Sequence, residues 1–253
     1  MGCYTGNSYK IASKMQYDLL LKLIAAHFVS DFLLQPSAWV NARNKHHFTA
    51  WQLYLHGLVT TTTVVILCGA DLWFIGIILG ISHIVLDGTK SYLKQSTLYF
   101  LTDQVIHFMI LAACWALFTG TSWNHQVIDH LYHNPEFWLY ACAILFLTGP
   151  SGILIELMTT RWRIQLSGIK GSLTSLEKAG MLIGIIERLL IFFLVIIGKY
   201  EAVGLLIAAK SLLRFNEKDR PEEKTEYLLV GTLISVALAL GTGFLVSNIH
   251  LIN

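Results

Sequence analysis

The sequence predicts an all-α protein, a polytopic transmembrane helical bundle of about eight spans. Hydrophobic residues make up 55% of the 253-residue chain and charged residues only 13%, whereas a soluble domain carries about 25% charged residues. The mean hydropathy is +0.58. The apolar residues are grouped in runs that are long enough to cross a bilayer as helices, in which every backbone polar group is paired internally.

Eight apolar runs are predicted to span the membrane. Aromatic residues, which favour the membrane–water interface, mark many of their ends, as at Tyr17, Trp51 and Trp138. The seventh run is short, so residues 201–215 either span the membrane or lie at its surface. The predicted spans are 17–34, 51–70, 72–87, 98–118, 136–157, 179–197, 201–215 and 227–247.

The positive charges indicate an orientation. With eight spans, most of the 18 Lys and Arg residues fall in loops on one side of the membrane. Loops rich in Lys and Arg stay in the cytoplasm, so we expect a multi-pass protein of a bacterial inner membrane with both termini outside. Membrane lipid is the expected partner. A net charge of +2 gives no reason to expect a nucleic-acid partner.

The loop from Thr119 to Glu136 contains no Lys or Arg, and it separates two halves of different composition. The half before it is rich in His and Asp, and the half after it has few His and more Gly. We therefore predict a four-span metal-site domain over residues 1–125 and a C-terminal transmembrane domain over residues 126–253. In the second domain, Glu187 and Lys210 are expected to pair within the membrane.

Four predicted spans carry His and Asp residues, and three of these spans carry a His/Asp pair spaced i, i+4. This spacing puts both side chains of a pair on one helix face, and the alternating topology puts all the pairs at the cytoplasmic ends of their spans. Ionisable groups at such positions are usually partnered and functional. The residues are His27, Asp31, His56, His83, Asp87, Asp103 and His107.

Imidazole and carboxylate groups are the usual non-thiolate ligands of zinc and similar ions. We predict that the seven residues form one site for divalent metal, zinc with manganese as the alternative. Seven candidate ligands are more than the four that a tetrahedral ion takes. Either two ions bind, or some of the seven residues only hold the ligands in position through hydrogen bonds. Asp31 or Asp103, where not a ligand, would be the catalytic base. Lys90, Gln35 and Gln104 flank the cluster and are predicted to be cofactor-binding residues. The lysine is also placed to contact an anionic group of a substrate, such as phosphate. A proton or ion relay and structural pairing are the alternatives to metal binding.

These residues fall in an ordered set of motifs: His27-x3-Asp31-x3-Gln35, His56, His83-x3-Asp87-x2-Lys90 and Asp103-Gln104-x2-His107. Over about residues 19–118 this pattern resembles a bacterial family of integral membrane proteins known as domain of unknown function 3307. Stretches near Glu187 and Lys210 look like the C-terminal region of its longer members. The motif style is also similar to that of bacterial membrane-bound metal-dependent hydrolases, as an analogy only.

The leading expected function is a membrane-embedded metal-dependent hydrolase that acts on a lipid or lipid-linked phosphoester from the cytoplasmic leaflet. One alternative is a transporter of divalent cations or protons. Transport needs polar residues that continue to the other face of the membrane. The fourth span beyond His107 reads FMILAACWALF and supplies none, which argues against a transport path. The other alternative is a non-catalytic sensor or assembly factor in which the metal is structural.

Overall fold

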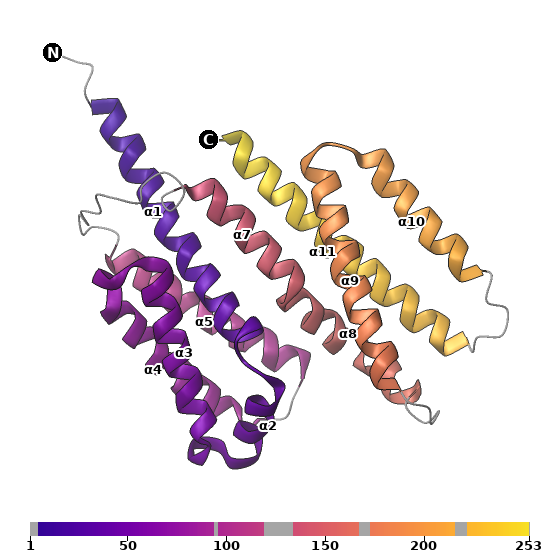
Figure 1. The fold of residues 1–253 in the computed structure, drawn as a ribbon, viewed down its shortest axis with the longest axis horizontal. Helices are drawn as coiled ribbons and strands as arrows, with labels where there is room; N and C mark the ends of the chain where they lie inside the picture. Colours follow the sequence, from indigo (N-terminus) through magenta and orange to yellow (C-terminus); the bar gives the residue numbers. More distant parts are fainter. Residues whose placement is uncertain (1–4, 94–95, 119–133, 167–172, 216–221, 253) are drawn as a thin grey trace. The chain divides into compact units, whose positions relative to one another are not determined.

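The computed structural model describes residues 5–93, 96–118, 134–166, 173–215 and 222–252 (Figure 1). The described residues are almost entirely helical and contain no strand, which confirms the all-α fold class. In chain order the elements are α1 (Thr5–Phe28), η1 (Val29–Leu33), α2 (Ser37–His46), η2 (His47–Thr49), α3 (Trp51–Cys68), η3 (Ala70–Leu72), α4 (Trp73–Lys90), α5 (Thr97–Phe118), α7 (Pro135–Thr148), α8 (Pro150–Leu166), α9 (Leu173–Ile196), α10 (Tyr200–Phe215) and α11 (Glu222–Ile252).

Five helical stretches in the described part of the chain are long and apolar enough to cross a membrane, which indicates a membrane protein. The predicted first span, 17–34, is not one of the five; it is divided between α1 and η1 and contains Asp18, Lys22 and Asp31. The predicted span 179–197 in α9 and the 16-residue α10 helix are not among them either. The five stretches are Trp51–Cys68, Ala70–Lys90, Thr97–Phe118, Pro135–Thr160 and Leu229–Ile249.

The chain divides into two compact units, Met1–Cys142 and Ala143–Asn253. In the first unit, α3 packs along α4, and α1 packs against both α3 and α5. In the second unit, α11 packs against α8 and α9, and α10 packs against α9. The domain boundary predicted between residues 125 and 126 lies outside the described residues.

Small residues let α3 and α4 approach closely, as in many membrane helix pairs. A Cβ atom added to Gly80 of α4 would lie 2.6 Å from the carbonyl oxygen of Gly57 in α3. Thr61 Oγ1 donates across the same contact to the carbonyl oxygen of Gly76, at 3.0 Å. The two helices that carry His56, His83 and Asp87 are therefore held at backbone contact.

Gly80→Ala is expected to destabilise the protein by about 1–3 kcal/mol, because the added methyl group must push the two backbones apart. The measurement is the thermal unfolding midpoint of the purified protein in detergent. Gly241→Ala in α11 is the matched control, since a Cβ atom there meets no heavy atom within 4 Å and alanine favours the helix. An unchanged midpoint in Gly80→Ala would contradict the close-contact account.

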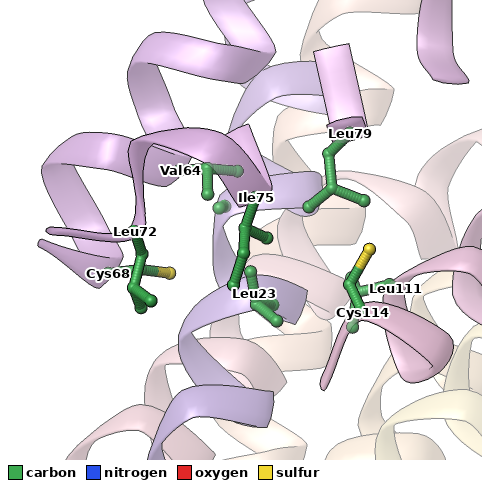
Figure 2. Close-up of a cluster of buried hydrophobic side chains, with 9 residues drawn as sticks. Leu23, Val64, Cys68, Leu72, Ile75, Leu79, Leu111 and Cys114 are labelled. Carbon is green, nitrogen blue, oxygen red and sulfur yellow. The ribbon is translucent and has the colours of Figure 1, made fainter. Parts of the chain in front are cut away.

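The interior of the first unit is a cluster of buried apolar side chains from α1, α3, η3, α4 and α5 (Figure 2). Three of its leucines lie one helical turn from His27, His83 and His107, so dry, packed side chains adjoin the polar cluster on three helices. The cluster consists of Leu23, Ala26, Val64, Cys68, Leu72, Ile75, Leu79, Leu111 and Cys114.

The predicted span 136–157 is interrupted at the junction of α7 and α8. Pro150 has no N–H and cannot continue the hydrogen-bond ladder of α7. At this break the buried carbonyl oxygen of Leu147 accepts hydrogen bonds from Ser151 Oγ and Arg188 Nε, both at 2.8 Å. The pairing predicted for Glu187 and Lys210 is confirmed, because Lys210 Nζ of α10 pairs with a carboxylate oxygen of Glu187 in α9.

A short helix occupies the region predicted to be a cytoplasmic loop. We call residues 37–49, which form α2 and η2, the α2–η2 segment. His47, at the helix junction with a positive φ of 53°, fixes this segment to the end of α4. Its Nδ1 atom lies 2.8 Å from Ser91 Oγ, and its ring stacks on Tyr92 with the centroids 4.0 Å apart. The hydrophobic pattern did not reveal this helix because it is short and mostly polar.

Candidate functional site

The structure brings the seven predicted His and Asp side chains into one buried cluster in the first unit. Residues of α1, η1, α3, α4 and α5 contribute to it. The Asp31 side chain is 9% exposed, and the other six residues are buried. The period of an α-helix thus converts four separate sequence motifs into one polar centre.

Asp31 lies in η1, a single turn of π-helix over Val29–Leu33. The N–H of Leu34 donates to the carbonyl oxygen of Val29 at 2.9 Å, the i+5 bond of a π turn. Pro36 disfavours a helical conformation for the residue before it, so the helix ends here. Ser30 Oγ lies 2.9 Å from Asp31 Oδ1 and fixes the carboxylate. Isolated π turns occur frequently at functional sites.

His27, Asp31 and His83 form the first triad. His83 Nε2 lies 3.2 Å from Asp31 Oδ1 and 3.2 Å from His27 Nδ1. His27 Nδ1 and Asp31 Oδ1 are 3.5 Å apart. No Lys or Arg in the described part of the chain pairs with Asp31.

Hydrogen bonds on the outer side of the first triad set the tautomers of its two imidazoles. His83 Nδ1 lies 2.8 Å from the carbonyl oxygen of Leu79, so it donates its proton there. The amide nitrogen of Gln104 lies 3.3 Å from Asp103 Oδ2, which turns the amide oxygen toward His27 Nε2 at 3.2 Å. His27 Nε2 is therefore the donor of that ring. In their neutral forms, both rings present a bare nitrogen to the centre of the triad.

Three hydrogen-bond acceptors thus point at one another in the first triad: His27 Nδ1, His83 Nε2 and Asp31 Oδ1. Three lone pairs at these distances repel unless a proton or a metal ion lies among them. Ligand atoms about 2.0–2.2 Å from a tetrahedral zinc ion are roughly 3.3–3.6 Å from one another. The three separations of 3.2–3.5 Å fit this geometry closely.

Asp87, Asp103 and His107 form the second triad, with ligand atoms within 4.8 Å of one another. Two positively charged side chains of the protein pair with its carboxylates. Arg43 Nη1 lies 2.5 Å from Asp87 Oδ2, and Lys90 Nζ lies 2.5 Å from Asp103 Oδ2. His107 Nδ1 donates to the carbonyl oxygen of Asp103 at 2.8 Å. The second triad therefore differs from the first in having its carboxylates neutralised by the chain itself.

His56 lies between the triads. Its Nε2 atom is 3.6 Å from Asp31 Oδ1 and 3.5 Å from Asp87 Oδ2. The residue is 1% exposed, and neither ring nitrogen has a hydrogen-bond partner among the described residues. A buried imidazole without partners costs free energy, so His56 is available as a fourth ligand of an ion in the first triad.

The three flanking residues differ in their contacts. Gln104 and Lys90 contact the cluster, through His27 and Asp103 respectively. Gln35 is half-buried between η1 and α2, and no hydrogen bond joins it to the cluster in the described part of the chain. The binding roles predicted for all three stay predictions.

Arg43 is the member of this centre that the sequence did not reveal. It is 5% exposed and reaches the cluster from α2. In the sequence it appears only as one of several basic residues of a predicted cytoplasmic loop. The available signal was Pro36 followed by ten residues without a helix breaker, which is consistent with a new helix.

Residues 19–134 match the model of a family described as protein of unknown function (DUF3307). Over this segment the resemblance to the DUF3307 family that the sequence predicted is confirmed. The DUF3307 segment contains all seven His and Asp residues of the cluster, together with Arg43 and Lys90. It extends beyond residue 118, where the resemblance seen in the sequence ended. Neither the curated proteins nor the solved structures include a match to the chain.

Proposed function

We propose that the His/Asp cluster binds a divalent metal ion, zinc with manganese as the alternative, and that the protein is a membrane-embedded metal-dependent hydrolase. One observation carries the proposal: three acceptor atoms in the first triad converge at separations that suit a tetrahedral ion. His27, His83 and Asp31 are the proposed ligands, with His56 as the fourth. The outward hydrogen bonds of His27 and His83 are those expected of metal-bound imidazoles.

The depth of the cluster supports a lipid or lipid-linked phosphoester as the substrate. His56 lies five residues after the start of α3, Asp87 three residues before the end of α4, and Asp103 six residues after the start of α5. At 1.5 Å per residue these positions are roughly 5–9 Å from the helix ends. Positions this close to the ends of spanning helices lie in the outer part of the hydrocarbon layer, and this is the part nearest to the phosphoester of a lipid.

Hydrolysis adds the oxygen of water to phosphorus, breaks a P–O bond, and transfers a water proton to the leaving oxygen. A bound divalent ion lowers the pKa of a coordinated water and polarises the phosphoryl oxygen. Asp31 lies beside the imidazoles of His27, His83 and His56 and beside Ser30, and no Lys or Arg of the described residues pairs with it, which suits a ligand. Asp103 lies outside that triad, beside Lys90 and Gln104, and is the proposed general base.

The apolar core favours hydrolysis over transport. A transporter needs polar groups that continue across the membrane. On the far side of the site Leu23, Leu79 and Leu111 adjoin the cluster one turn deeper on three helices, and the buried polar groups beyond them on α1, Asp18 and Lys22, are paired with each other. Flux of divalent metal into proteoliposomes, abolished by His56→Ala, would contradict the hydrolase proposal and support transport. Loss of folding on chelation, without turnover of any lipid phosphoester, would instead support a structural metal in a sensor or assembly factor.

We further propose eight spans in a bacterial inner membrane, with the cluster at the cytoplasmic end. Single cysteines at Lys45 in α2 and at Asp71 in η3, introduced with Cys3 replaced by serine, are expected to report opposite sides. An impermeant maleimide added to intact cells should label Asp71→Cys and leave Lys45→Cys unlabelled. Both positions are exposed in the structure, and the three remaining cysteines are buried. Labelling of both from the same side would contradict the proposed topology.

A further inference from the structure

Two cations border the cluster at its membrane-surface end. Arg43 lies on α2, outside the five candidate spans, and Lys90 is the last residue of α4. The Arg43 side chain is 7% exposed and the Lys90 side chain 25% exposed. Both groups therefore adjoin the cluster at the ends of candidate spans, and the ends of a spanning helix are its parts nearest to lipid phosphates.

The charges of the cluster suit one metal ion. Asp31, Asp87 and Asp103 supply three negative charges, and Arg43 and Lys90 supply two positive ones. With neutral imidazoles, the cluster carries one net negative charge. One divalent ion would change this to one positive charge, which a bound anion then balances. A second ion would compete with the guanidinium and ammonium groups for the carboxylates of the second triad.

Arg43 has donor capacity that the described residues do not use. Its Nη1 atom lies against Asp87, while its Nε–H is buried and has no hydrogen-bond partner in the described part of the chain. An unpaired buried donor of a charged group costs free energy. The planar guanidinium presents its N–H groups in a fork that matches two oxygens of a phosphate.

We infer that Arg43 and Lys90 form a subsite for a phosphate group beside a single metal ion held by the first triad. The inference rests on the proposed function and assigns the second triad to anion recognition in place of a second ion. Asp87 and Asp103 hold the two cations in position until the phosphate binds. Transfer of Lys90 from Asp103 to the phosphate leaves Asp103 free to accept a proton.

The test uses the full chain in phosphatidylcholine nanodiscs, loaded with zinc. Metal per chain is measured by mass spectrometry, and inorganic phosphate is titrated by calorimetry. We expect about one ion per chain in the wild type, Arg43→Lys and Lys90→Gln. The dissociation constant for phosphate should rise about tenfold or more in each variant. Arg43→Lys keeps a cation beside Asp87, so the fold and the metal are retained.

Lys45→Gln, which removes an exposed cation of the same helix, is the control and should bind phosphate as the wild type does. A parallel titration in nanodiscs that contain phosphatidic acid distinguishes two sources of the phosphate group. Competition by the lipid identifies a headgroup as the ligand, and unchanged phosphate binding identifies free phosphate.

Two ions per chain, or phosphate binding that neither Arg43→Lys nor Lys90→Gln weakens, would overturn the inference and leave the metal centre intact. A wild type that holds no metal would overturn the proposed function itself. Loss of metal in Arg43→Lys or Lys90→Gln would also overturn the inference, because these side chains would then act only as supports of the ligands.

Discussion

His83→Ala is expected to abolish metal binding by the purified protein. His83 Nε2 lies 3.2 Å from both other acceptors of the first triad, so its removal leaves the ion with His27, Asp31 and the more distant His56. Loss of a residue that only supports a ligand lowers metal affinity about 10–100-fold, and loss of a ligand should have at least that effect. Mass spectrometry of detergent-purified protein, prepared with zinc or manganese, gives the metal content per chain.

His47→Ala is the control for this measurement. His47 contacts Ser91 and Tyr92 at the end of α4, and no hydrogen bond or ring contact joins it to the first triad among the described residues. It should therefore retain about one ion per chain. If no preparation of the wild type contains metal that His83→Ala loses, the cluster is not a metal centre, and a proton shared among the three acceptors becomes the better account.

Asp103→Asn is expected to lower turnover by about 10²–10⁴-fold, the usual contribution of a general base, and to leave the metal in place. The amide has the size of the carboxylate but cannot accept the proton of the attacking water. Asp103 Oδ1 lies 3.7 Å from His107 Nδ1 and belongs to the second triad, so the ligands of the first triad are unchanged. The assay is release of product from a panel of phospholipids and lipid-linked phosphoesters in mixed micelles.

The matched control is Asp71→Asn, which changes an exposed carboxylate of η3. Asp71 follows the C-terminal end of α3, whereas the cluster residue His56 lies near the N-terminal end of that helix. It should retain both metal and turnover. Full turnover in Asp103→Asn with metal bound would show that another group accepts the proton. Loss of metal from Asp103→Asn would make this residue a ligand.

The sequence predicted those parts of the site that depend on helical periodicity. The i, i+4 spacing of His83 and Asp87 requires only that the apolar run around them be a helix. The alternation of spans requires only that apolar runs cross the membrane. Both conditions follow from local hydrophobicity, so the convergence of residues on four helices could be expected before the structure was available.

The parts that the sequence did not predict depend on tertiary contacts or on small changes in backbone geometry. Arg43 reaches Asp87 from a polar helix whose position is set by contacts such as that of His47 with Ser91. The π turn at Asp31 adds one residue to a helical turn, and the amino-acid composition of this stretch gives no sign of it. Pro150 was a visible signal for the break between α7 and α8, although the apolar sequence around it favoured one continuous span.

The α2–η2 segment affects how a substrate could reach the cluster. It packs against the ends of α3 and α4, and Arg43 extends from it to Asp87. In the proposed topology this segment lies on the aqueous side of the cluster, so we expect a lipid to enter sideways, between helices and within its own leaflet. The velocity should then follow the mole fraction of the lipid in the bilayer. Dilution with an inert lipid should slow the reaction even when the amount of substrate per volume of buffer stays constant.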